Sequence, residues 1–173
     1  MNRSIFFNKA DKSITLGNRI ALKSFLEQQM KKERIKVECL QYVFCSDKYL
    51  LGINKQYLNH DYYTDIISFD LSEIKGQLIG DVYISVDRVK ENAKSMKNTQ
   101  GNELLRVIFH GALHFCGYKD KKPADAKLMR SMEDKWLRAF LKSVPRGTRA
   151  RKASDDWRWI LINVILRTFI RTN

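Results

Sequence analysis

Two histidines four residues apart carry the clearest chemical signal in this chain of 173 residues. On a helix, the spacing of His110 and His114 places both side chains on one face, one turn apart. Their imidazoles can then share one metal ion, and zinc favours such nitrogen ligands. Gly117 is expected to end the helix, so that Asp120 can return as an oxygen ligand. The pattern predicts one zinc ion on His110, His114 and Asp120, with a fourth position open to water as in catalytic sites.

The same residues leave other interpretations open. A histidine pair at this spacing also occurs by chance at a surface or as a hydrogen-bonded feature of a core. Asp125 is a rival for the role of third ligand. The helix of zinc proteases reads HExxH, and its glutamate is the general base. This chain has Gly111 at that position, which disfavours a protease and leaves room for either a bulky substrate or close helix packing.

The charge balance points to a polyanionic partner. Lys and Arg total 32 against 19 Asp and Glu, a net charge of +13, and RNA, DNA and an anionic membrane surface all stay open. Cys39, Cys45 and Cys116 are odd in number and lack CxxC spacing, so neither a disulfide framework nor a cysteine zinc site is predicted. Residues 1–10 contain no apolar run suited to a signal peptide. A cytoplasmic location is therefore predicted.

The sequence predicts both helices and strands around the histidine pair. Apolar spacing predicts five helices, and short β-branched or alternating runs predict four strands, the last two forming a hairpin. The helices are expected at residues 19–32, 47–58, 86–97, 103–116 and 123–141, and the strands at residues 4–7, 35–44, 64–69 and 78–84. Ser46 and Ser85 are expected to cap two of these helices. The result is a single-domain α+β fold, a small mixed sheet with helices packed on it and a zincin-like HxxxH helix in the core.

The character of the chain changes after residue 142. Residues 145–152 are basic and read as a linker, and residues 157–170 are apolar and aromatic. That apolar segment is shorter than the roughly 20 residues needed to span a bilayer, so no membrane partner is predicted. We expect one domain over residues 1–142 and an extension over residues 143–173 whose role the sequence does not indicate.

Three motifs together resemble the YbeY family, the metal-dependent endoribonucleases of bacterial ribosomal-RNA maturation. The first is the signature His110-Gly111-x-Leu113-His114-x-x-Gly117-Tyr118-x-Asp120. The second is Ile53-Asn54-Lys55-Gln56-Tyr57 followed by Thr64-Asp65-Ile66-Ile67-Ser68-Phe69, and the third is Gly80-Asp81-Val82-Tyr83-Ile84-Ser85. The resemblance covers roughly residues 35–141, and the tail after residue 142 lies outside it.

This chain departs from the family pattern at two positions. The family usually has a third histidine where this chain has Asp120, and aspartate is an accepted zinc ligand through oxygen. The family also tends to carry an arginine in the substrate cleft just after the aromatic residue, where Leu58 follows Tyr57. Lys55 is a candidate substitute for that cation. His60 is interpreted as a surface-loop residue, with proton transfer or RNA stacking as the alternative.

The resemblance implies a zinc-dependent, single-strand-specific endoribonuclease. Its expected work is ribosomal RNA processing, including maturation of the 3′ end of small-subunit rRNA, and ribosome quality control. The expected partners are single-stranded RNA, ribosomal RNA and the small ribosomal subunit, with His114 as the catalytic residue. Two alternatives stay open: a non-enzymatic ribosome-assembly factor with a structural metal, and another metal-dependent hydrolase built on the HxxxH helix.

Overall fold

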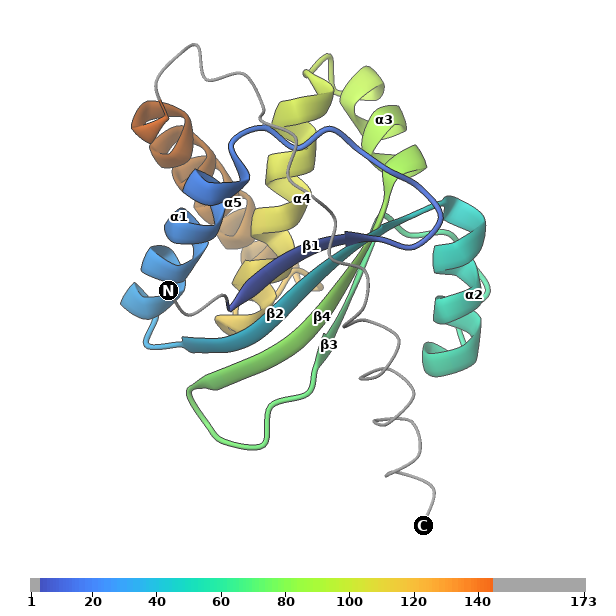
Figure 1. Cartoon of the computed structure of the whole chain (residues 1–173). Helices are drawn as coiled ribbons and strands as arrows, with labels where there is room; N and C mark the ends of the chain where they lie inside the picture. The colour runs from blue at the N-terminus through green and yellow to red at the C-terminus, as the bar shows by residue number, and fades with distance from the viewer. Residues whose placement is uncertain (1–3, 145–173) are drawn as a thin grey trace.

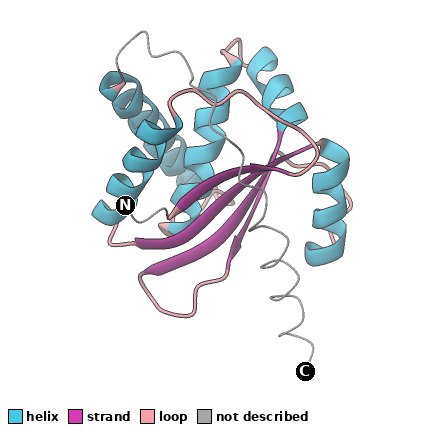
Figure 2. Cartoon of the chain, viewed as in Figure 1, coloured by secondary structure: helices cyan, strands magenta, loops and turns pink. Residues whose placement is uncertain are grey.

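In the computed structural model, which describes residues 4–144, a four-stranded sheet carries helices on both faces (Figures 1 and 2). The strands are β1 (Ile5–Lys9), β2 (Lys36–Cys45), β3 (Ile66–Asp70) and β4 (Gln77–Ser85). Their order is β1-β2-β4-β3; β1, β2 and β4 are parallel, and β3 is antiparallel to β4. The predicted mixed sheet and the hairpin of its last two strands are therefore confirmed.

The five helices begin where the sequence offers a cap. They are α1 (Arg19–Lys32), α2 (Asp47–Leu58), α3 (Val86–Ser95), α4 (Gln100–Phe115) and α5 (Pro123–Ser143). The first four have a side-chain cap that accepts a backbone N–H of the first turn, supplied by Asn18, Ser46, Ser85 and Thr99. Helix α4 begins three residues earlier than predicted because Thr99 caps it. Pro123 opens α5, where its fixed φ suits the first helical turn.

Helix α4, which carries the histidine pair, is held in place by apolar packing in the main core. The main core lies between the sheet and helices α1, α4 and α5. Half of the residues of α4 are buried, among them Leu104, Ile108 and Leu113. A smaller cluster lies under α2 on the opposite face of the sheet and contains Cys45, Leu50 and Ile67. The predicted α+β fold class, a mixed sheet with helices packed on it, is confirmed.

Helix α4 packs closely against the sheet at Gly111. A Cβ at this position would lie 2.9 Å from Ile66 Cδ1 and 3.1 Å from Val82 Cγ1. Real Cβ atoms essentially never lie as close as 2.9 Å to a neighbour, so a side chain here would force the Ile66 and Val82 side chains, or α4 itself, to shift. Of the two roles predicted for Gly111, room for a bulky substrate and close helix packing, the structure shows the second.

None of the helices within residues 4–144 is both long and apolar enough to cross a membrane. Helix α5 continues to Ser143, just past the predicted domain boundary. The predicted basic linker at residues 145–152 and the apolar segment at residues 157–170 lie outside the described residues. The division of the chain after residue 142 stays a prediction.

Candidate metal centre

The structure brings His110, His114 and Asp120 together at the C-terminal end of α4. The two histidine Nε2 atoms lie 2.9 Å apart, and Asp120 Oδ2 lies 3.5 Å from the first and 3.7 Å from the second. Zinc ligands at ~2.0–2.1 Å from a tetrahedral ion lie about 3.3 Å from one another. The observed separations bracket that value. Within residues 4–144, the potential metal-binding group consists of these three side chains and does not include Asp125.

A sharp turn after α4 returns Asp120 to the histidines. Gly117 has a φ of +91°, a left-handed conformation that glycine adopts without steric cost. Its N–H donates to the carbonyl of His114, and the N–H of Tyr118 donates to the carbonyl of Leu113, the pattern of hydrogen bonds that closes a helix end. The glycine stop predicted from the sequence is therefore the device that positions the third candidate ligand.

The other nitrogen of each ring is held by a hydrogen bond, which fixes how the rings face the centre. His110 Nδ1 lies 2.8 Å from Glu133 Oε1, and His114 Nδ1 lies 3.0 Å from the carbonyl oxygen of Tyr118. A carbonyl and a carboxylate only accept, so both Nδ1 atoms carry the proton and donate. Each neutral ring then presents the lone pair of Nε2 to the shared point, the arrangement found around metal-ligating histidines.

Three acceptor atoms facing one point call for a cation between them. Burial acts to lower the pKa of His110, but the hydrogen bond and charge of Glu133, with the charge of Asp120, outweigh burial and raise it. Burial and the charge of His110 lower the pKa of His114. The pKa shifts of the two rings run in opposite directions because a charge on His110 opposes a charge on His114. A divalent ion between the two Nε2 atoms and Asp120 would satisfy all three acceptors.

Glu133, which the sequence analysis missed, is the buried support of the centre. Its side chain is 6% exposed, and its second oxygen, Oε2, lies 3.2 Å from Arg106 Nη1 and 3.2 Å from Arg130 Nη1. Burial acts to raise the pKa of Glu133, but His110 and the arginines outweigh it, so the net shift is downward and the group is ionised at neutral pH. One carboxylate thus orients a candidate ligand and anchors two cations.

The other residues singled out from the sequence lie apart from the three candidate ligands. His60 lies in an exposed loop after α2, where its ring stacks on Tyr62 with centroids 5.0 Å apart. Lys55 forms an ion pair with Asp61, at 2.7 Å. Leu58, at the position of the expected cleft arginine, is exposed at the end of α2. None of these three side chains forms a hydrogen bond, an ion pair or a ring contact with His110, His114 or Asp120.

Comparison with known proteins decides the family. The family model described as endoribonuclease YbeY matches residues 6–141, a span that contains all three candidate ligands and Glu133. The chain belongs to the endoribonuclease YbeY family. The resemblance inferred from the three motifs is confirmed, and the matched span reaches further toward the N-terminus than the motifs do.

Curated YbeY proteins show how much of the chain is shared. A protein named endoribonuclease YbeY from Cytophaga hutchinsonii is 49% identical over 131 residues, which cover 76% of this chain and 92% of the relative. One from Flavobacterium psychrophilum is 56% identical over 101 residues, covering 58% and 71%. A solution structure of a Thermotoga maritima protein is 26% identical, with a TM-score of 0.55, covering 84% of this chain and 99% of that chain. The matched part of this chain therefore spans between 71% and 99% of the length of these three proteins.

Proposed function

We propose that this chain is a zinc-dependent endoribonuclease that cleaves single-stranded ribosomal RNA in the cytoplasm. Its substrates would include the 3′ end of small-subunit rRNA, and its partner in this work and in ribosome quality control would be the small ribosomal subunit. The observation that carries the proposal is the convergence of His110 Nε2, His114 Nε2 and Asp120 Oδ2 with both Nδ1 atoms already engaged. Membership of the YbeY family and the net charge of +13 support an RNA substrate.

In this proposal His110, His114 and Asp120 hold one zinc ion. When bound at such a site, zinc supplies Lewis-acid polarisation of a phosphoryl oxygen and lowers the pKa of water. Glu133 and the carbonyl of Tyr118 keep both imidazole rings in the tautomer that can bind the ion. His114 is the proposed catalytic residue, because its side chain is the more exposed of the two, at 32% against 20% for His110.

The segment around Asp120 supplies charge for the substrate. Lys119, Lys121 and Lys122 flank the aspartate in the loop between α4 and α5. Lysines beside a metal centre attract the phosphates of a nucleic-acid backbone without reading its sequence. We further propose that residues 1–142 form the catalytic domain and that residues 143–173 are an appended basic linker and apolar extension.

The test is to measure zinc content and cleavage of a single-stranded RNA on the same preparations. The wild type should hold about one zinc per chain and cleave, whereas His114→Ala and Asp120→Ala should lose both. Asp125→Ala is the matched control, because Asp125 also follows the turn but is not part of the three-residue group; it should behave as wild type. Absence of zinc from the wild-type protein, or full cleavage by His114→Ala, would contradict the proposal.

One observation keeps a second function in view. Leu58 occupies the position where the resemblance leads us to expect a cleft arginine, and its side chain is 41% exposed, so that cation is missing from the end of α2. In a non-enzymatic assembly factor the metal would only hold the turn after Gly117 to α4. Chelation would then lower the melting temperature of the protein, while RNA cleavage would stay at the background level before and after chelation.

A further inference from the structure

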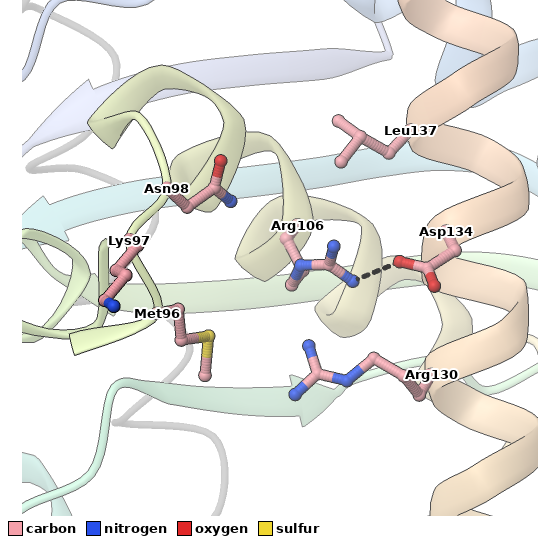
Figure 3. A pocket seen from close by; sticks show the side chains of 7 residues that line it. All are labelled: Met96, Lys97, Asn98, Arg106, Arg130, Asp134 and Leu137. Atoms are coloured by element: carbon pink, nitrogen blue, oxygen red, sulfur yellow. Dashed lines mark hydrogen bonds and ion pairs between the residues drawn. The ribbon is translucent and has the colours of Figure 1, made fainter. Parts of the chain in front are cut away.

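A polar pocket lies beside Arg106 and Arg130, the two arginines that contact Glu133. It is formed where the turn between α3 and α4 faces the side of α5, and its volume is about 460 Å³. Figure 3 shows the seven residues that line it: Met96, Lys97, Asn98, Arg106, Arg130, Asp134 and Leu137. Sites for small ligands or parts of larger ones are typically ~300–1,000 Å³, so the pocket is large enough to hold a chemical group of a substrate.

Three cations line this pocket, and two of them are paired with carboxylates. Lys97, Arg106 and Arg130 share its walls with Asp134, and Glu133, which is not on the wall, pairs with both arginines. The guanidinium groups of Arg106 and Arg130 lie close together, because each has its Nη1 atom 3.2 Å from the same oxygen of Glu133. Figure 3 shows both groups between α4 and α5, with Lys97 across the pocket. Two neighbouring guanidinium groups with donors to spare form a site that suits a phosphate.

The arginine at the back of the pocket is rigidly held. The Arg106 side chain is only 16% exposed, and its Nη1 atom lies 2.7 Å from Asp134 Oδ1 as well as 3.2 Å from Glu133 Oε2. Its Nε also faces Glu103, at 3.8 Å. Arg130 is 52% exposed and Lys97 is exposed, so the two cations at the mouth can adjust to a ligand. Arg106 is already ordered, so a bound ligand would pay no ordering cost for it, whereas Arg130 and Lys97 would have to be ordered on binding.

The pocket and the candidate metal centre share one carboxylate. Glu133 accepts from His110 through Oε1 and from both arginines through Oε2. Arg106 also precedes His110 by four residues on α4, so their Cα atoms are about 6 Å apart along the helix axis. Successive phosphates of one RNA strand would therefore reach from the metal centre to the pocket within a short stretch of nucleotides.

We propose that the pocket lined by Lys97, Arg106 and Arg130 binds a backbone phosphate of the RNA substrate at a position away from the cleaved bond. This inference rests on the proposed function, since it assumes that the RNA strand passes the metal centre. The shared chemistry is that of a phosphate group, and free inorganic phosphate is the other possible source. Recognition of a phosphate would strengthen binding without selecting a base.

The test compares the double variant Lys97→Gln/Arg130→Gln with wild type as full-length proteins. Both side chains are exposed or half-exposed, so the variant should fold, and a melting curve checks this. Lys31→Gln/Lys142→Gln is the control, because it removes two exposed charges outside the pocket. The affinity for a fluorescent single-stranded oligoribonucleotide is measured over a range of salt concentrations. The stabilisation of each protein against thermal unfolding by inorganic phosphate is measured in the same buffer.

We expect the pocket variant to bind the RNA about tenfold more weakly, with a salt slope smaller by ~0.7, the value for one phosphate contact on a single strand. The control should stay within about twofold of wild type. Equal affinities and slopes for the two variants would overturn the inference. If the pocket variant loses stabilisation by inorganic phosphate but binds RNA as tightly as wild type, the pocket binds free phosphate. That result also overturns the inference. A wild type that binds RNA with the expected slopes but does not cleave it would refute the proposed function and leave the pocket assignment standing.

Discussion

Replacing Glu133 with glutamine should weaken zinc binding even though Glu133 is not a candidate ligand. In the structure one oxygen of Glu133 accepts from His110 Nδ1 at 2.8 Å, and the other accepts from Arg106 and Arg130, each at 3.2 Å. Glutamine has nearly the same shape but only one acceptor oxygen. If that oxygen serves His110, the amide NH₂ faces two guanidinium donors; if the amide rotates, His110 loses its acceptor.

The expected losses of zinc affinity and of stability depend on which hydrogen bonds His110, Arg106 and Arg130 keep in the Glu133→Gln variant. Loss of such a partner behind a metal-binding histidine typically weakens metal affinity ~10–100-fold, which corresponds to about 1.4–2.7 kcal/mol. The metal-free protein should also lose stability, by less than the ~3–5 kcal/mol of a fully broken buried ion pair. Arg106 keeps Asp134 at 2.7 Å and Arg130 is 52% exposed, so a cost of ~1–3 kcal/mol in unfolding free energy is expected.

The control variant Asp134→Asn separates the effect of losing the carboxylate that orients His110 from the effect of losing a negative charge beside Arg106. Asp134 pairs with the same arginine but has no contact with His110 among the described residues, and its substitution removes the same unit of charge. The zinc dissociation constant is measured by competition with a chromophoric chelator, and the unfolding free energy by urea titration of the metal-free proteins. Glu133→Gln should weaken zinc binding at least tenfold, and Asp134→Asn less than about twofold. Equal zinc affinities in the two variants would refute the argument.

Three further predictions address packing, thiol chemistry and the third ligand. Gly111→Ala should lose up to about 2 kcal/mol of unfolding free energy, since ~1–3 kcal/mol of overpacking outweighs the ~1 kcal/mol gain in helix propensity. The control Gly52→Ala, where the added methyl group meets open space, should gain about 1 kcal/mol. If urea titration finds the two variants equally stable, the close packing at Gly111 is contradicted. Cys45 should resist iodoacetamide at pH 8 in the native protein and react in urea, as judged by mass spectrometry, because burial and nearby aspartates raise the pKa of its thiol to about 12; labelling at equal rates in both states would be inconsistent with that burial. Asp120→His should keep about one zinc per chain by elemental analysis, because histidine supplies a nitrogen ligand at the same place, and loss of zinc would mean that the carboxylate itself is required.

Local signals predicted most of the elements of this fold. Helices α1 and α2 have the bounds expected from apolar spacing, and Ser46 and Ser85 cap helices as expected. The order of the strands could not be derived in this way, because parallel pairing of β1 with β2 and of β2 with β4 depends on contacts between residues far apart in sequence. The start of α4 was misplaced because the polar first turn after Thr99 lacks the apolar spacing that marks the rest of the helix.

The candidate ligands were predictable, whereas the residues that orient them were only partly so. His110, His114 and Asp120 are close in sequence, so helix geometry and the glycine stop suffice to bring them together. Glu133 lies on a different helix, and no spacing rule connects it to His110. A signal was nevertheless present: Glu133 falls at helical spacing from Met129 and Trp136, which are buried on the apolar face of α5. A carboxylate at a core-facing position needs a partner, and its partners are the candidate ligand His110 and two arginines.

The carboxylate at position 133 supports the candidate metal centre but lowers the stability that an apolar core residue would give. Taking Glu133 and Arg106 out of water costs several kcal/mol per ion, and buried pairs of this kind are often no more stable than apolar residues of similar volume. An apolar side chain at position 133 would complete the buried face of α5. It could not accept the Nδ1 proton of His110, however, and the ring could then move its proton to Nε2 and turn a donor toward the other two candidate ligands. The demands of packing and of metal binding therefore oppose each other at residue 133, and the carboxylate found there satisfies the second.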